Sequence, residues 1–417
     1  MDINPIAIAI PVFVVLIFIE YGVALLQKRD VYRFSDAVTN LSCGISQQAS
    51  EVFLKALLIL PYLWVYEHFR IQELSSAWWG THLLALVLLD FSYYWWHRWT
   101  HEMNIGWVTH VVHHQSEEYN LAVALRQSLT SSLTTWVFYL PLAVLGVHWE
   151  VYVGHLALNT LYQFWVHTET IRKMGPFGWI MNTPSHHRVH HGINPQYVDK
   201  NYAGVFIIWD RMFGTFEEEG EEVVYGTIKP LQSFNPYWAN LWYLMLLCKD
   251  ALAAKTWHDR LKVWVARPGW RPEGLDPYPK PTLLKRTDQD KYAPTVTTGM
   301  AWYVGAHFLP VIVGLVVLLW LEGPQMSWTL SVLASAILLA NLSWGGLFER
   351  RSWAVPLELF RVLFSCGFGV FLLSQLGGWM SWAGAGALTT AAIASAVFLW
   401  RWHRETPKSA GALTASG

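Results

Sequence analysis

The sequence predicts an all-α integral membrane protein with about nine transmembrane helices and a cytoplasmic helical cap that carries a histidine-rich site for two metals. Long apolar runs, basic residues gathered on one side of those runs, and spaced histidines between them support this expectation. Of the 417 residues, 53% are hydrophobic and 14% are charged. Because soluble domains carry about 25% charged residues, the composition itself favours a membrane protein.

Nine apolar segments are expected to cross a hydrocarbon layer of about 30 Å as helices. The first contains one acid, Glu20, and basic residues follow it rather than precede it, so we do not expect a secretory leader. The second and fourth segments are short, and their ends are the least certain. The expected spans are 6–26, 52–66, 82–96, 133–147, 152–166, 301–321, 326–343, 357–376 and 382–400.

Basic residues follow the first, third, fifth, seventh and ninth spans. Cytoplasmic flanks carry the excess of Lys and Arg, so this alternation predicts an outside amino terminus and a cytoplasmic carboxyl terminus. A bacterial inner membrane is favoured over the endoplasmic reticulum, since no retrieval ending is visible. The basic residues are Lys28, Arg29, Arg33, Arg98, Arg172, Lys173, Arg350, Arg351, Arg401 and Arg404.

Five parts are expected along the chain. Residues 1–80 form amino-terminal transmembrane helices, 81–230 a catalytic domain, and 231–300 a cytoplasmic interfacial segment. Residues 301–405 form carboxyl-terminal transmembrane helices, and 406–417 a disordered tail. The interfacial assignment depends on the mixture of Trp264, Trp270, Arg267 and Arg271 with prolines.

Charge and cysteine content argue against nucleic-acid binding and against a metal site built from cysteine thiolates. The formal net charge is −1, and nucleic-acid binding would need a basic face, so no nucleic-acid partner is expected. The three cysteines, Cys43, Cys248 and Cys366, are too far apart in sequence for a thiolate metal motif. Nitrogen and oxygen atoms must therefore hold any metal.

Three short clusters hold most of the histidines, at spacings that bring imidazole rings to one face of a helix. Eight such rings are too many for one four-coordinate zinc site, so we expect two metals. All three clusters lie on the side that the basic flanks place in the cytoplasm. They are His97 and His101; His110, His113 and His114; and His187, His190 and His191, with His186 directly before the third.

A polar stripe runs through the fifth span, where His155, Asn159, Gln163 and His167 recur every four residues. Polar groups inside a membrane face a protein interior or cavity, so the stripe should point toward the metals. We expect His167 to be a ninth ligand, and Asn159, Gln163 and Glu102 to be the candidate catalytic residues. For His155, hydrogen bonding between helices competes evenly with ligation.

Imidazole suits zinc, copper, nickel and iron, so the residues themselves leave the metal open. A zinc site needs about three protein ligands and an open position, whereas oxygen chemistry needs a metal that changes valence. Ligating histidines normally give their second N–H to a carboxylate or carbonyl. Asp90, Glu102, Glu169 and Asp199 are near enough in sequence to be the acceptors.

The patterns H-x3-H, H-x2-H-H and H-x2-H-H resemble the fatty acid hydroxylase and sterol desaturase superfamily of membrane di-iron enzymes. Within it the chain is most similar to the alkylglycerol monooxygenase family. The resemblance lies in the segments 97–102, 163–169, 186–192 and 194–216, so the motifs cover roughly residues 80 to 230. The four carboxyl-terminal spans are similar to that family as well.

This resemblance implies two iron ions, with zinc able to occupy the same imidazoles. His186 and His187 compete for one position, and His186 is the less certain ligand. Glu102 matches an acidic position that orients a ligand or donates a proton. The implied ligands are His97, His101, His110, His113, His114, His167, His187, His190 and His191.

The implied reaction is insertion of oxygen beside the ether bond of an alkylglycerol lipid taken from the membrane, with O2 and tetrahydrobiopterin or another external electron donor. The sequence has no dinucleotide fingerprint, haem-attachment motif or iron–sulfur cysteine set, so the electrons must come from outside. A sterol or fatty-acyl hydroxylase or desaturase is the nearest alternative. A zinc-binding transporter is a further one, although its ligands should follow a path across the membrane.

Overall fold

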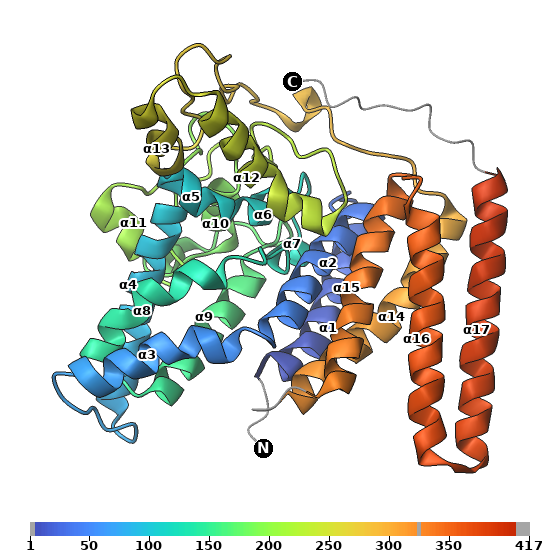
Figure 1. The fold of residues 1–417 in the computed structure, drawn as a ribbon. Helices are drawn as coiled ribbons and strands as arrows, with labels where there is room; N and C mark the ends of the chain where they lie inside the picture. The colour runs from blue at the N-terminus through green and yellow to red at the C-terminus, as the bar shows by residue number, and fades with distance from the viewer. Residues whose placement is uncertain (1–4, 323–326, 406–417) are drawn as a thin grey trace. The chain divides into compact units, whose positions relative to one another are not determined.

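The computed structural model describes residues 5–322 and 327–405, and within these ranges the protein is all-helical, as predicted (Figure 1). The only paired extended backbone in those ranges is two isolated bridges, between Met181 and Phe206 and between Gly192 and Tyr225. The tail predicted to be disordered, 406–417, lies outside the described residues.

Long helices of 13 or more residues are separated by groups of short helices with three to nine residues. In chain order they are α1 (Pro5–Leu26), α2 (Phe34–Glu51), α3 (Lys55–Phe69), α4 (Trp79–Glu102), α5 (Asn104–Val108), α6 (Val111–His114), α7 (Leu121–Ala124), α8 (Ser132–Val144), α9 (Trp149–Trp165), η1 (Gly175–Trp179), α10 (Pro184–His190), α11 (Ile208–Phe213), α12 (Pro236–Ala253), α13 (Trp257–Val265), η2 (Arg286–Asp288), α14 (Thr298–Leu321), α15 (Trp328–Phe348), α16 (Ala354–Leu376) and α17 (Gly378–Glu405).

Two compact units make up the chain. The first, here called the histidine unit, extends to Gln232 and adds Tyr237–Tyr292, so it contains nearly all of α1 to α13. The second, the carboxyl-terminal unit, comprises Ser233–Pro236 and the residues from Ala293 onward. The five-part division expected from the sequence is finer than this one and stays a prediction.

Among the described residues, five helices are long and apolar enough to cross a membrane, which supports an integral membrane protein. They are α1, α14, α15, α16 and α17. Side-chain caps start two of them, because the Thr297 hydroxyl accepts from the Met300 amide and the Ser327 hydroxyl accepts from the Leu330 amide. All four helices of the carboxyl-terminal unit pack against their neighbours in sequence.

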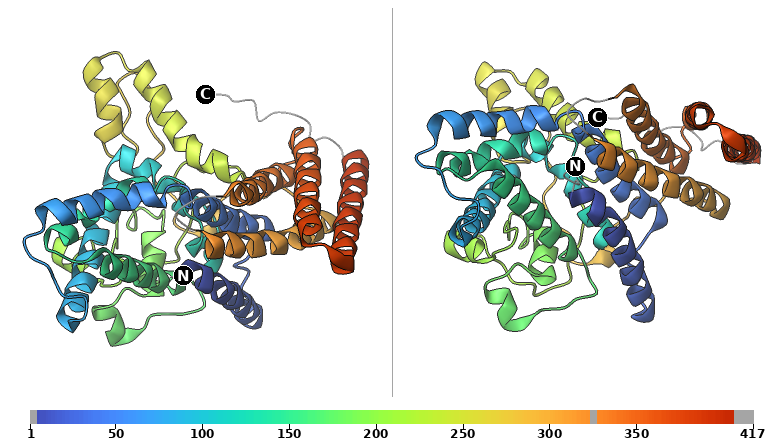
Figure 2. Two further views of the ribbon diagram at one scale, coloured as in Figure 1. Left: turned by 60° about the horizontal axis from the view of Figure 1, so that its bottom comes forward. Right: turned by 90° about the horizontal axis from the view of Figure 1, so that it is seen from below.

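The other four expected spans are helices as well, but they do not meet the same criteria, so the count of nine is not confirmed. α3, α8 and α9 have 15, 13 and 17 residues, and α4 has 24 residues of which the last turns are polar. α3 packs against α8, and α4 packs against both α8 and α9, around a core that includes Tyr62, Leu89, Leu142 and Tyr152. Figure 2 shows this bundle from two further sides.

Short helices follow α4, before α8 begins, because polar and turn residues interrupt the apolar pattern there. α5 lies directly on the end of α4, where a side chain at Gly106 would meet the Thr100 Cα at 2.8 Å, so only glycine allows this approach. The segment 231–300, expected to be interfacial, contains α12 and α13, which bury Tyr243, Leu247 and Val263 against α5 and α6. These contacts hold the chain after α4 close to that helix.

Candidate metal centre

Nine buried histidines converge in the histidine unit and fall into two groups, within each of which the ring nitrogens lie no more than 4.8 Å from one another. We call them the five-ring group and the four-ring group. The five-ring group is His97, His101, His110, His114 and His190, and the four-ring group is His113, His167, His187 and His191.

The first cluster extends from the carboxyl-terminal turns of α4. His97 and His101 are four residues apart, so both rings leave the same face of the helix, and both are buried. The helix ends after Glu102 because Met103 adopts an extended backbone. Both rings join the five-ring group.

The second cluster lies around α6, which has only four residues. His110 precedes the helix with a non-helical backbone, and its Nε2 is 2.9 Å from His97 Nε2 and 3.1 Å from His114 Nε2. His113 points to the other group, where its Nε2 is 3.1 Å from His167 Nε2. The three rings therefore do not share one side, because a helix this short does not impose a common face.

The third cluster is on α10, which begins with Pro184 in its first turn, where a proline needs no hydrogen-bond partner. His187 and His191, four residues apart, join the four-ring group, while His190 joins the five-ring group. Since the second and third clusters each contribute to both groups, α6 and α10 connect the two.

His167 comes from outside the three clusters, just beyond the end of α9. Its Nδ1 donates to the Gln163 carbonyl at 2.8 Å, and its Nε2 lies 3.0 Å from His187 Nε2. The polar stripe on α9 thus leads into the four-ring group at His167. His155 lies outside both groups, with its Nδ1 bonded to the Val151 carbonyl.

Backbone carbonyls, one of the two expected kinds of acceptor, accept from the second nitrogen of several rings. Besides the His167 bond, His97 Nδ1 donates to the Tyr202 carbonyl at 2.7 Å. His113 Nδ1 donates to the Arg126 carbonyl at 3.0 Å, and His190 Nδ1 to the Lys200 carbonyl at 3.0 Å. Each of these bonds leaves Nε2 free of hydrogen, which is the form that binds a metal.

The turn at 199–202 presents two of those carbonyls. Asp199 and Asn201 both have positive φ, 60° and 55°, a conformation that Asn and Asp tolerate better than most residues. The Asn201 side chain fixes the turn by donating to the His186 and Glu217 carbonyls and accepting from the Glu217 amide. Lys200 and Tyr202 therefore direct their carbonyls to His190 and His97.

Two buried acids hold the chain that follows this turn. Asp90 accepts from the amides of Val205 and Phe206 at 2.7 and 2.9 Å, and also from Asn159 and the Trp209 indole. Asp210 accepts from the amides of Tyr202 and Ala203 at 2.7 and 2.8 Å. A Cβ at position 204 would lie 2.8 Å from Asp90 Oδ1, so the backbone can approach Asp90 this closely only because residue 204 is a glycine.

Arg126, whose exposed fraction is 2%, is a buried residue whose role the sequence did not predict. Its Nε donates to the Val112 carbonyl, Nη1 to Asn40 Oδ1, and Nη2 to Gln115 Oε1. Its own carbonyl receives His113. Arg126 thus fixes α6 from inside, and no spacing or composition distinguishes it from an exposed arginine.

The remaining predicted residues have partners elsewhere. His186 is outside both groups, with its Nδ1 3.2 Å from the Thr183 hydroxyl. Glu102 pairs with Arg98 and Arg267 at 3.1 and 3.8 Å. Gln163 donates to Asn159, and Glu169 pairs with Arg286 at 2.6 Å. Asp199, by contrast, lies beside the five-ring group, with its Oδ1 4.0 Å from His101 Nδ1.

The donor set fits a pair of metal ions. Within the described part of the chain, the Nε2 atoms of His101, His190 and His191 are buried without a hydrogen-bond partner, which is costly unless something else binds them. Ligands about 2.1 Å from one ion at right angles are about 3 Å apart, as the facing nitrogens are here. Five rings exceed the four positions of a structural zinc site.

The rings also have the charge state that ligation needs. Burial lowers the pKa of His190 to about 3 and the pKa of His113 to about 4. Burial likewise lowers the pKa of His110, His114 and His191 well below the usual value. All five are neutral at pH 7, so a metal need not displace protons from them.

Known proteins similar to this chain share this region. The fatty acid hydroxylase family profile matches residues 82–215. The alkylglycerol monooxygenase of Xenopus tropicalis is 38% identical over 355 residues, covering 84% of this chain and 79% of the relative. That of Danio rerio is 37% identical over 373 residues, covering 88% and 82%. That of Homo sapiens is 43% identical over 267 residues, covering 63% and 59%.

No solved structure matches the chain. The matched residues 82–215 include all nine converging histidines and both buried acids, Asp90 and Asp210. The expectation of a bacterial inner membrane gets no support from these comparisons, because the three relatives are animal proteins.

Proposed function

Since this chain belongs to the alkylglycerol monooxygenase family, within the fatty acid hydroxylases, we propose that its nine converging histidines hold two iron ions for ether-lipid cleavage. The protein is an O2-dependent membrane lipid monooxygenase with a histidine-lined iron site. The further steps, namely two ions, the ether substrate and the reductant, are our proposal.

The division of the nine rings into groups of five and four carries this proposal. It supplies one complete nitrogen set for each of two ions, and α6 and α10 hold the two sets together. When bound, iron would supply the valence change that activation of dioxygen requires. Zinc would fit the same imidazoles but lacks that valence change.

We propose the following balance for the reaction. One atom of O2 enters the C–H bond beside the ether oxygen, and the other leaves as water with two electrons and two protons from the reductant. The hemiacetal then breaks its C–O bond to give a fatty aldehyde and glycerol. Tetrahydrobiopterin or another external donor would supply the electrons, because the sequence carries no dinucleotide, haem or iron–sulfur motif.

The protein's own residues orient the rings in this scheme. The carbonyls of Tyr202, Lys200, Arg126 and Gln163 fix four of the rings with Nε2 directed inward. Asn159 and Gln163 connect Asp90 to the segment that carries His167, so we assign them a positioning role. Glu102, beside His101 and bonded to Arg98, remains our candidate for a proton donor.

We also propose that α3, α4, α8 and α9 enter the membrane, which would give nine spans with the histidine centre on the cytoplasmic side. The alternation of basic flanks, from Arg29 to Arg404, supports this orientation. Accessibility of single engineered cysteines in the α3–α4 and α8–α9 connections would test it. Labelling of both connections from the cytoplasmic side would contradict it.

The function itself is tested by lipid conversion and metal analysis on the purified protein. We expect two irons per chain and oxygen-dependent conversion of an alkylglycerol to a fatty aldehyde when a reduced pterin is supplied. A sterol or acyl-chain product instead would assign the chain to the alternative chemistry. Binding of a single metal per chain would contradict the two-ion proposal.

A further inference from the structure

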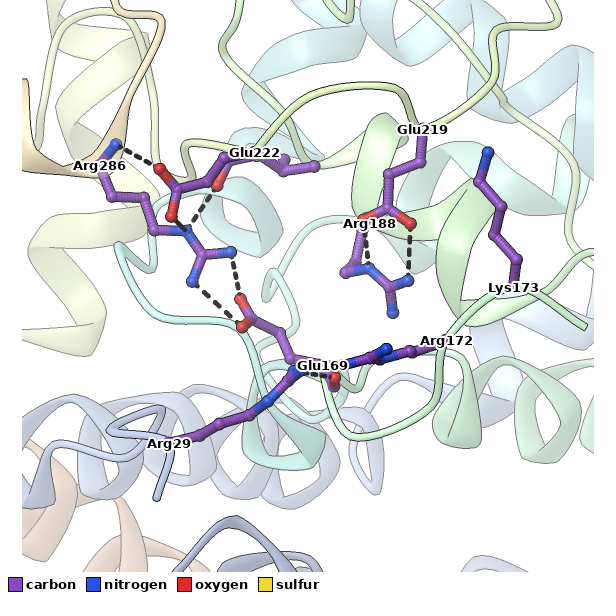
Figure 3. Close-up of a pocket in the computed structure, with 9 residues that line it drawn as sticks. Arg29, Glu169, Arg172, Lys173, Arg188, Glu219, Glu222 and Arg286 are labelled. Atoms are coloured by element: carbon purple, nitrogen blue, oxygen red, sulfur yellow. Dashed lines mark hydrogen bonds and ion pairs between the residues drawn. The ribbon is translucent and has the colours of Figure 1, made fainter. Parts of the chain in front are cut away.

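A pocket of about 300 Å³ opens in the histidine unit beside the segments that carry His167 and His187 (Figure 3). Five basic and three acidic side chains line it, so positive charge is in excess. The lining residues are Arg29, Glu169, Arg172, Lys173, Arg188, Glu219, Glu222, Val223 and Arg286.

Two of the arginines are fully used in holding the walls. Arg188 forms a bidentate ion pair with Glu219, in which Nε and Nη2 each donate to one carboxylate oxygen at 2.7 Å. Its Nη1 donates to the carbonyls of Thr168 and Ile171. Arg286 pairs with Glu169 at 2.6 Å. Figure 3 shows the two pairs on opposite sides of the opening.

The other two arginines have donors to spare. Arg29 donates from Nη1 to the Glu169 carbonyl, and its remaining donors face no carboxylate among the described residues. Arg172 is exposed and has no ion pair within the described ranges. Lys173 adds a third charge, shared with Glu218 at 3.6 Å on the surface. The pocket therefore has walls held by ion pairs, and two guanidinium groups, those of Arg29 and Arg172, that have no carboxylate partner among the described residues.

The chain places this pair at the membrane boundary. α1, a candidate span, ends at Leu26, and the Arg29 amide folds back to the Ala24 carbonyl, so Arg29 stays at the end of that helix. Phosphates of lipid headgroups lie at this level, and basic pockets between membrane helices bind them. Among the anions common at that depth, a phosphate has the oxygen arrangement that best matches a pair of guanidinium groups.

We propose that this pocket binds the headgroup phosphate of an anionic phospholipid, held by Arg29 and Arg172. The bound phosphate connects the turn after α1 to the segment after His167, and it joins them from outside the metal centre. This inference concerns binding alone and is independent of the oxidation that the protein performs.

Native mass spectrometry of the full-length protein in detergent tests it, with phosphatidylglycerol, phosphatidylcholine and inorganic phosphate titrated separately. We expect phosphatidylglycerol to bind most tightly. Replacing both residues, Arg29→Gln with Arg172→Gln, should weaken that binding about fivefold for each arginine and about thirtyfold together. The pair Arg401→Gln and Arg404→Gln, two exposed charges at the end of α17, is the matched control and should change nothing.

Three results would overturn the proposal. Equal binding of the anionic and zwitterionic lipids would remove the charge preference, and binding of inorganic phosphate alone would make the ligand a soluble anion. Unchanged binding in the double variant would remove the site. If the double variant misfolds, Arg172→Gln alone, at an exposed position, must still weaken binding, while the pair Arg29→Lys and Arg172→Lys, which keeps the charge but not the guanidinium geometry, must weaken binding less than the Gln pair does.

Discussion

Asp90 in the histidine unit and Glu358 in the carboxyl-terminal unit are both fully buried acids on long helices, but they have partners of different kinds. Asp90 receives two backbone amides of an irregular segment, together with Asn159 and Trp209. Glu358 receives only side chains, from Arg361, Tyr303 and Ser343, all on membrane helices.

The difference shows that a buried acid can either fix an irregular segment or join helices that are already regular. Around Asp90 the acid fixes chain that has no regular structure of its own, and that chain supplies the Tyr202 carbonyl to His97. Around Glu358 the acid joins three helices that are already regular, α14, α15 and α16. Loss of the first should therefore affect the metals, and loss of the second should affect only the stability of the helix bundle.

Removing a histidine ring tests whether the two ring groups bind metal, on which the comparison of Asp90 with Glu358 depends, and should have the largest effect. In His113→Ala the four-ring group loses one of its ligands, so we expect turnover to fall to background and iron to drop from two per chain to about one. Metal analysis and product formation on the purified protein measure both. His186→Ala is the control, because that ring is outside both groups and should leave metal content unchanged.

Asp90→Asn should have the next largest effect, since the amide cannot accept from all four donors. Mutation of residues that support ligands costs about tenfold to a hundredfold in metal affinity or activity. We expect about tenfold here, because Asp90 acts through the 202–206 segment. The Mössbauer spectrum of the iron-loaded variant should change, and an unaltered spectrum with normal turnover would separate Asp90 from the metal centre.

Glu20→Gln tests whether an acid on a membrane helix supports the centre in the same way. Glu20 accepts from the Leu121 amide at 2.8 Å and from the Thr168 hydroxyl, next to His167. Gln offers one acceptor oxygen in place of two, so the contacts beside His167 weaken and we expect turnover to fall several-fold with iron content reduced less. Wild-type turnover in the Glu20→Gln variant would contradict this role.

Glu358→Gln should have the smallest effect on turnover and a clear effect on heat stability. The change leaves Arg361 buried without its partner, and breaking such a pair costs about 3–5 kcal/mol. Iron content and activity at low temperature should match the wild type, while thermal unfolding should begin earlier. A loss of iron in this variant would remove the distinction between the two acids.

Periodicity and composition predicted the parts of the molecule that are regular. Apolar runs predicted α1 and the four carboxyl-terminal helices, and i, i+4 spacing predicted the pairs His97 with His101 and His187 with His191. The stripe on α9 predicted that His167 would lie with the clusters. These features depend on local geometry, which a sequence encodes directly.

The remaining features depend on contacts between distant segments. The assignment of His113 to one group and His114 to the other follows from how α6 is held by Arg126, 12 or more residues away. For His97 and His190 the acceptors are the backbone carbonyls of Tyr202 and Lys200, which the turn with left-handed Asp199 and Asn201 presents. No residue type distinguishes a carbonyl that faces a ring from one that does not.

The interleaving of the clusters has a consequence for how the protein matures. Because α6 and α10 each contribute rings to both groups, under the two-ion proposal the first ion to bind would hold in place helices that the second ion also needs. The second ion then binds to a site that is already shaped, so filling should be cooperative. A cell short of iron would hold a mixture of empty and complete protein, with few half-filled chains.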